Sequence, residues 1–310
     1  MNIRTIVEAD LDIILALLED QSINTTTVDR FKDYLDSGAY RFEWTWVAER
    51  DGAIVALAVW WGMEQSDHPF SIDGLYIATE EDPVPVWSEL IRQSLAAFPS
   101  DAGQSEYHFF LPNGWRDRPE VVAALEPRLA AAAAAGLSET TERLRYEWMP
   151  ESGLPARSTR LRFEPAGDEA FLDVFRRVID GSLDAGTARA VARVGVEGAA
   201  KEDLEIYMSM PGERSWWRLA YDADGELVGF ALPSANQSGP VVGYLGVLAE
   251  HRGHRYSDDL LAEITHVLVD SGAELIRADT DLANKPMAAS FERQGYRNFA
   301  VRMVATHPLG

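Results

Sequence analysis

A repeat between the two halves of the chain constrains its fold more than any other feature. The segment Asp51–Ala58 (DGAIVALA) returns as Asp224–Ala231 (DGELVGFA), and each is typical of an Asp-Gly hairpin turn that opens an apolar strand. Further along, Leu75–Ile77 matches Leu245–Val247 at a separation of 170 residues (245 minus 75). A chain of 310 residues has room for two domains of about 150 residues each. We therefore expect two domains with one plan.

The spacing of apolar residues predicts that plan. Each half reads as a strand, one or two helices, three strands, a helix, a strand, a helix and a strand, which is an α/β class with a mixed, mostly antiparallel sheet flanked by helices. In the second half we expect strands near residues 159–164, 215–222, 227–234, 241–249, 274–280 and 297–305, and helices near residues 168–181, 186–209, 256–271 and 284–294. Prolines and a glycine in Met149–Pro155 suit a linker, so the domains are expected over residues 1–150 and 157–310.

The segment Leu245–Leu261 combines an apolar strand, a basic turn that contains glycine, and an amphipathic helix. Such a turn aims unpaired backbone N–H groups and the positive end of the helix at one point, which is an arrangement that binds phosphate. Arg252, His254 and Arg255 add positive charge there. The alternative is an ordinary strand-turn-helix with a basic tip.

This turn resembles the pyrophosphate-binding signature of the GCN5-related N-acetyltransferase (GNAT) superfamily, which runs Arg or Gln, two residues, Gly, one residue, and Gly or Ala. Arg252 fills the first position, while Arg255 and Ser257 stand where a glycine and a small residue are expected. Downstream, Asn284 lies seven residues before Phe291 and eleven before Gly295, a spacing similar to the closing motif of that family. The order and spacing of the two motifs strengthen the resemblance.

The resemblance implies a GNAT-type domain in the second half that binds acetyl-CoA. Pantetheine would pair with the strand edge and pyrophosphate would bind the turn, and the cofactor-binding residues would be Leu245, Gly246, Val247, Arg252, Gly253, His254, Arg255, Tyr256, Ser257, Asn284 and Phe291. The Val247 N–H would stabilise the oxyanion of the thioester carbonyl.

The acid and the base of such a transfer are less well marked in the sequence. Many members of the family place a tyrosine at the position of Phe291 to protonate the departing thiolate, so Tyr244 and Tyr296 are the substitutes to consider. Asp279 and Asp281 would share a face if the strand persisted, and Asp279 is the candidate base. The alternatives are that Asp281 caps the following helix and that Asp279 ends the strand in solvent.

The first half departs from the family at the matching turn. Glu80, Glu81 and Asp82 would repel a pyrophosphate, and Pro83 and Pro85 remove two backbone donors. We therefore expect a degenerate GNAT-like domain that does not bind coenzyme A and has a structural role or walls the acceptor cleft. Family members with a tandem plan and one degraded half are consistent with this expectation.

Charge and composition limit the classes of ligand and partner that the chain is expected to bind. The formal net charge of −22 argues against nucleic acid and anionic membranes as partners and would attract a cationic substrate, although an acidic surface that serves solubility is an equal alternative. The sequence has no cysteine and its histidines show no metal-binding spacing, so no metal is expected. The start of the chain has no signal-like segment, so we expect a cytoplasmic protein. Both a monomer and a homodimer are compatible with the sequence.

The sequence thus predicts an N-acetyltransferase that moves an acetyl group from acetyl-CoA directly to the amine of a small, cationic, metabolite-like or antibiotic-like acceptor. A different class stays open: a catalytically weak acyl-CoA-binding sensor or scaffold, for which Arg255 and Phe291 are the evidence. Transfer of a longer acyl group is a third alternative.

Overall fold

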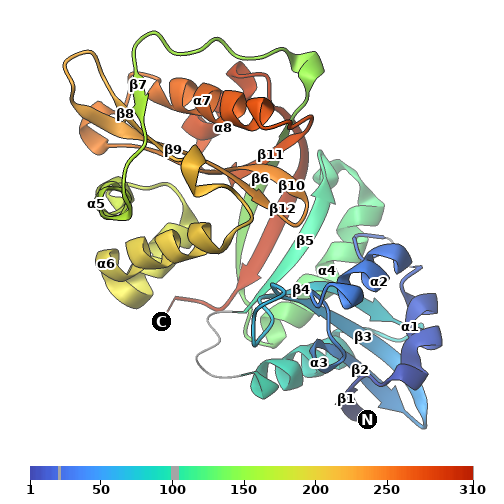
Figure 1. The fold of residues 1–310 in the computed structure, drawn as a ribbon. Coiled ribbons are helices and arrows are strands. Elements are labelled where there is room, and N and C mark those ends of the chain that lie inside the picture. The colour runs from blue at the N-terminus through green and yellow to red at the C-terminus, as the bar shows by residue number, and fades with distance from the viewer. Residues whose placement is uncertain (20–21, 99–104, 310) are drawn as a thin grey trace. The chain divides into compact units, whose positions relative to one another are not determined.

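The computed structural model describes residues 1–19, 22–98 and 105–309, and its contacts divide the chain into two compact units (Figure 1). Unit 1 consists of Met1–Glu142 and Val301–Gly310, and unit 2 consists of Arg143–Ala300. None of the described helices is long and apolar enough to cross a membrane.

Unit 1 contains a mixed sheet in the order β1-β2-β3-β4-β5. All neighbours are antiparallel except β4 and β5, whose parallel ladder joins Ser71 to Glu106 and Ile72 to Tyr107. The strands are β1 (Asn2–Thr5), β2 (Thr45–Arg50), β3 (Ala53–Trp61), β4 (Ser71–Ile77) and β5 (Glu106–Pro112), and the helices are α1 (Leu11–Leu17), α2 (Val28–Asp36), α3 (Val84–Ala97) and α4 (Pro119–Ala134).

Unit 2 repeats this arrangement, with a sheet in the order β7-β8-β9-β10-β11-β6. Its one parallel pair among the described strands is β10 with β11. The strands are β6 (Glu139–Trp148), β7 (Arg162–Glu164), β8 (Arg218–Tyr221), β9 (Leu227–Asn236), β10 (Gly239–Val247), β11 (Ile276–Asp281) and β12 (Arg297–Thr306), and the helices are α5 (Asp168–Ile179), α6 (Ala185–Ser209), α7 (Tyr256–Asp270) and α8 (Lys285–Arg293). The predicted α/β class, with two tandem domains of mostly antiparallel mixed sheet, is confirmed, as is the order of elements in the second half.

The units do not coincide with two consecutive halves of the chain. The last strand of the first half, β6, pairs residue by residue with β11 from Ile276 opposite Trp148 to Asp281 opposite Arg143, so residues 143–148 belong to unit 2. The last strand of the chain, β12, starts in unit 2, and its residues from Val301 onward belong to unit 1. The two units therefore differ from the expected domains, which meet near residues 150–157, because the end of β6 belongs to unit 2 and the end of β12 belongs to unit 1.

The two faces of the unit 2 sheet carry different apolar cores. One core joins Phe171 and Phe175 of α5 to Trp217 and Phe230, with edge-to-face and tilted ring pairs whose centroids lie 4.9–6.5 Å apart. The other core packs α7 and α8 against the opposite face and includes Tyr146 from β6. Helices α5 and α6 thus cover one face, and α7 and α8 cover the other (Figure 1).

Candidate functional site

Strands β10 and β11 run side by side only at their starts. Their described ladder consists of one pair, Val241 opposite Arg277, and beyond it the strands diverge. The Leu248 N–H donates to the Val228 carbonyl at 2.9 Å, and since alternate residues of an antiparallel strand bond to the same neighbour, Leu245 and Val247 direct their backbone groups away from β9. The backbone groups of Leu245 and the N–H of Val247 therefore line the opening between β10 and β11, where an extended polar ligand can pair with them. The Val247 carbonyl is held by Arg252.

The turn after β10 leads into α7 through two residues with positive φ. Gly253 has φ +86° and Arg255 has φ +59°, and Arg255 is the N-cap of α7 without a capping side-chain bond. A left-handed residue with a β-carbon costs about 1–2 kcal/mol, which explains why a glycine suits the position of Arg255. The first N–H groups of α7, at Tyr256 and Ser257, follow this turn.

Arginines neutralise the two carboxylates in the first turn of α7. Asp258 accepts hydrogen bonds from Arg293 at 2.7 and 2.8 Å, and Asp259 pairs with Arg160. Arg160 also donates to the carbonyl of His254 at 3.0 Å. The N-terminus of α7 therefore keeps its attraction for an anion, although two acidic residues lie beside it.

Arg252, which the sequence places first in the anion turn, has a different role in the structure. Its Nε donates to Val247 O at 3.1 Å, Nη1 to Gly181 O at 3.2 Å and Nη2 to Val178 O at 3.1 Å. All three guanidinium nitrogens thus hold backbone carbonyls and join the end of β10 to the end of α5. Through these hydrogen bonds, Arg252 fixes the position of the turn between β10 and α7.

Gly246 is required by packing on the α5 face. A β-carbon there would lie 2.8 Å from Phe230 Cε1 and 2.9 Å from Val178 Cγ1, both of which belong to the α5 core. Gly246 therefore lets β10 approach α5.

The closing motif lies on α8. Asn284 is the N-cap of α8 and accepts a hydrogen bond from the Met287 N–H at 3.3 Å. Phe291 is buried and stacks on Tyr146 at 4.8 Å between ring centroids. Tyr296 is also buried, and its hydroxyl bonds to Thr265 Oγ1 at 2.8 Å, so it is committed to the core.

Tyr244 lies on the opposite face of β10, in an aromatic cluster. Its ring stacks on Tyr207 of α6 with centroids 5.6 Å apart and also contacts Phe175 and Phe230. Burial, followed by the charge of Asp203, raises the pKa of Tyr244, so its hydroxyl stays protonated as a hydrogen-bond donor.

Asp279 and Asp281 share a face of β11, as predicted, and Arg143 of β6 binds both. Arg143 donates to Asp279 Oδ1 at 2.9 and 3.1 Å, to Asp281 Oδ1 at 2.7 Å and to Asp184 Oδ2 at 3.0 Å. Asp281 also accepts the Ala185 N–H at 2.6 Å. The alternative that Asp281 caps the following helix is wrong, because Asn284 is the N-cap of α8 and the Asp281 carboxylate binds the first N–H of α6 instead.

The corresponding strand edge of unit 1 is occupied by side chains. The Ala78 N–H donates to Val55 O at 2.9 Å, so Leu75, the counterpart of Leu245, also points its carbonyl away from the neighbouring strand. This carbonyl accepts hydrogen bonds from Asn24 at 3.2 Å and from Arg128 at 3.0 Å. Strand β4 is buried over nearly its whole length, whereas every residue of β10 is partly exposed.

The helix start in unit 1 is also occupied. The Asp82 carboxylate accepts the Val84 N–H at 3.0 Å at the start of α3, and Glu81 pairs with Arg50 at 2.7 Å. The first half therefore holds its own carboxylate where the second half offers an anion site.

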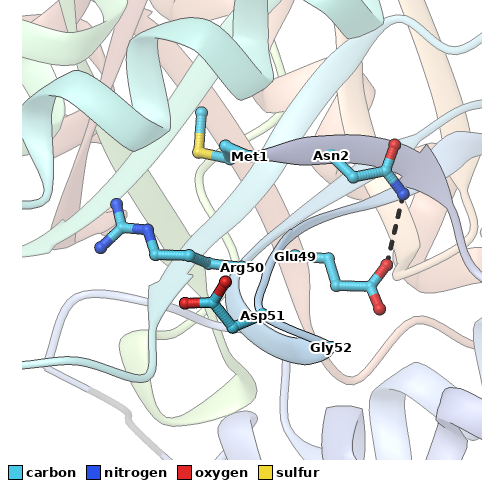
Figure 2. Close-up of a pocket in the computed structure, with 6 residues that line it drawn as sticks. All are labelled: Met1, Asn2, Glu49, Arg50, Asp51 and Gly52. Carbon is cyan, nitrogen blue, oxygen red and sulfur yellow. Dashed lines mark hydrogen bonds between the residues drawn. The ribbon is translucent and has the colours of Figure 1, made fainter.

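A separate hollow in unit 1 carries no such chemistry. Figure 2 shows Met1, Asn2, Glu49 and the turn Arg50–Gly52 around it. Asn2 donates to Glu49 at 3.3 Å, and Asp51 and Gly52 both have positive φ, as the predicted Asp-Gly hairpin requires. Among the residues that the structure describes, no group of three His, Asp or Glu side chains could hold a metal ion.

Three residues near the opening were missed by the sequence analysis: Arg143, Asp184 and Asp203. Asp184 had a local signal, since it stands three residues before Thr187, whose N–H it accepts at 2.9 Å as the N-cap of α6. Arg143 had none, because its partners lie 136 and 138 residues away in the chain.

Comparisons with known proteins agree with this geometry. Residues 191–296 match the acetyltransferase (GNAT) family. No curated protein matches the sequence.

Solved structures with the same fold cover nearly the whole chain. A GCN5-related N-acetyltransferase from Sphaerobacter thermophilus has a TM-score of 0.60 at 15% identity, covering 99% of this chain and 96% of its own. A tandem GNAT protein from the clavulanic acid biosynthesis pathway has a TM-score of 0.52 at 16% identity, covering 98% of each chain. A glucosamine N-acetyltransferase region of a fungal multi-domain β-N-acetylglucosaminidase has a TM-score of 0.57 at 12% identity, covering 98% of this chain and 38% of that one. Residues 191–296 of the chain thus form a domain that matches the acetyltransferase (GNAT) family.

Proposed function

We propose that unit 2 binds acetyl-CoA and transfers its acetyl group to the amine of a small, cationic acceptor. The observation that carries this proposal is the divergence of β10 from β11, which leaves the backbone groups of Leu245 and the N–H of Val247 directed into an opening. Pantetheine carries amides that can pair with such a strand edge. The pyrophosphate would lie at the turn Gly253–Ser257, on the N–H groups at the start of α7.

The Val247 N–H would polarise the thioester carbonyl. It belongs to a strand that is fixed on one side by β9 and at its end by Arg252, so its direction does not change when charge develops on the oxygen. A preorganised donor of this kind lowers a barrier by about 3–4 kcal/mol. Acetyl-CoA supplies an activated acetyl group, and the chain supplies its orientation.

The first half does not offer a second donor site in this proposal. Arg128 and Asn24 occupy the carbonyl that would pair with pantetheine, and the Asp82 carboxylate occupies the helix start. Its role is structural: it contributes β6 to unit 2, and with it Arg143 and Tyr146.

The acceptor class follows from charge. The net charge of −22 attracts a cation, and Asp184, Asp279 and Asp281 outnumber the single guanidinium of Arg143 that they share. An ammonium group near this face would be favoured over an anion.

A second candidate function is an acyl-CoA-binding sensor or scaffold without efficient turnover. Phe291 favours it, because a buried phenylalanine in the core cannot protonate a departing thiolate. A thiol with a pKa near 8.5 is a good leaving group even without a proton donor, so Phe291 does not rule out the transferase function. Measuring turnover against a panel of amines separates the two functions.

The test is a calorimetric titration of acetyl-CoA into the full chain, followed by an amine screen with product masses. We expect one site per chain. Ser257→Glu places a carboxylate at the start of α7, where it suits the helix dipole but repels phosphate, and should weaken binding more than tenfold. Ser238→Glu, with the same charge change at an exposed turn residue, is the control. Two sites per chain, or equal affinity in Ser257→Glu, would contradict the proposal.

A further inference from the structure

The C-terminal part of α6 lies directly on β10. The Tyr207 hydroxyl donates to Gly243 O at 3.0 Å, and the Tyr207 ring stacks on that of Tyr244. Both contacts lie at the register shift between Val242 and Tyr244 in β10. This part of the helix is therefore fixed at the point where β10 leaves β11.

Asp203 lies one turn before Tyr207 on the same side of α6. Residues four apart on a helix are neighbours on its surface, and the side chain of a helical residue leans toward the N-terminus. The charge of Asp203 acts on the hydroxyls of both Tyr207 and Tyr244. Its carboxylate is therefore close to the aromatic pair that covers β10 beside the opening.

The Asp203 carboxylate has no hydrogen bond or ion pair within residues 1–19, 22–98 and 105–309, and Asp203 is only partly exposed. A partly buried carboxylate without a partner is costly. The other carboxylates of this face are used differently, since Asp184, Asp279 and Asp281 all bind Arg143. Asp203, unlike these three carboxylates, can therefore accept a proton without breaking a structural contact.

The electrostatic surroundings suit this role. Burial, and then the charges of Asp184 and Glu202, raise the pKa of Asp203 to about 7. A general base works best when its pKa lies near the working pH. The titratable and charged groups that act on Asp203 or its two tyrosines are Asp184 at the N-cap of α6, Glu202 and Tyr207 of α6, Tyr244 of β10, Arg143 of β6 and Arg252 of the turn.

We propose that Asp203 is the general base of the transfer: its carboxylate takes one proton from the acceptor ammonium. This inference rests on the proposed function of unit 2 and replaces the sequence-based expectation that Asp279 is the base. The neutral amine then attacks the thioester carbon, so that a C–N bond forms and the C–S bond breaks. The sulfur leaves with the electron pair and gains the second proton lost by nitrogen. Asp203 returns its proton to solvent.

The test compares Asp203→Asn with the wild-type chain, using an amine that the wild type acetylates. At pH 7, kcat/KM should fall by about 10²–10⁴-fold, while the Kd for acetyl-CoA in calorimetry stays within threefold. The wild-type pH profile should show an acid limb with an apparent pKa near 7 that is absent in Asp203→Asn. The limb should stay in place with a second acceptor whose amine has a different pKa.

Two variants control for structural effects. Glu205→Gln, on an exposed residue of the same helix, should leave kcat/KM unchanged, and Asp203→Glu should restore part of the rate and keep the acid limb. If Asp203→Asn retains kcat/KM within threefold of wild type with the same limb, Asp203 is not the base. If the wild type binds acetyl-CoA but acetylates no amine, the proposed function fails and Asp203 loses its role with it.

Discussion

Replacing Arg143 with methionine should destabilise the protein strongly. Methionine keeps an apolar stem of similar length but removes the charge that Asp184, Asp279 and Asp281 share. The side chain of Asp281 is 3% exposed and that of Arg143 is 19% exposed, whereas those of Asp279 and Asp184 are 25% and 34% exposed. The pair with Asp281 therefore dominates. Breaking a buried pair by removing one partner costs about 3–5 kcal/mol, and we expect a loss in that range at pH 8.

The loss should depend on pH in a direction set by Asp281. Burial raises the pKa of Asp281 and Arg143 opposes that rise, so removing Arg143 raises the pKa further. A carboxyl with a raised pKa in the folded state binds more protons folded than unfolded, so stability falls as pH increases from the ordinary carboxyl range through the folded value. Each such group changes the free energy of unfolding by up to about 1.4 kcal/mol per pH unit.

The assay is urea unfolding followed by tryptophan fluorescence at pH 5, 6, 7 and 8. Arg176→Met is the matched control, because Arg176 pairs with Glu197 on the surface and exposed pairs contribute about 0–1 kcal/mol. Two results would refute this prediction. One is a smaller loss in the free energy of unfolding for Arg143→Met than for Arg176→Met at pH 8, and the other is an equal loss for Arg143→Met at pH 5 and pH 8.

Three further variants test the turn and its counterpart. Arg255→Gly should raise the free energy of unfolding by about 1 kcal/mol, since it relieves a left-handed residue; thermal unfolding measures this, and a loss would contradict it. Arg252→Met leaves three carbonyls without their donor, so it should lower the free energy of unfolding by about 1–2 kcal/mol and weaken acetyl-CoA binding. An unchanged free energy of unfolding in urea would show that these hydrogen bonds contribute little to stability. Asp82→Asn should leave the Kd for acetyl-CoA within threefold in calorimetry, and a tenfold change would assign the donor site to the first half.

Local sequence patterns were sufficient for the order of the elements. The Asp-Gly turns, the apolar strands and the amphipathic helix after Arg255 each depend on residues within a few positions of one another, and such signals are visible in one sequence. The free edge of β10 was expected only from the resemblance to the GNAT family, because no local pattern shows where two neighbouring strands diverge.

Interactions between distant segments were not predictable. The exchange of β6 into unit 2 depends on strand pairing between residues 128 to 138 positions apart, and no local pattern encodes such a register. Arg252 shows the same limit, since a basic residue in an anion turn has the same local signal whether its side chain faces a ligand or the carbonyls of α5. Asp203 resembles any polar residue on a surface helix until its lack of a partner is seen in three dimensions.

The most direct test of the central claim is hydrogen exchange of the full chain with and without acetyl-CoA. The account predicts slower exchange in residues 244–248 and 253–258 of unit 2, with residues 74–78 and 82–87 of unit 1 unchanged. Protection of the unit 1 segments, or binding that protects neither β10 nor the start of α7, would contradict the assignment of the donor site to unit 2.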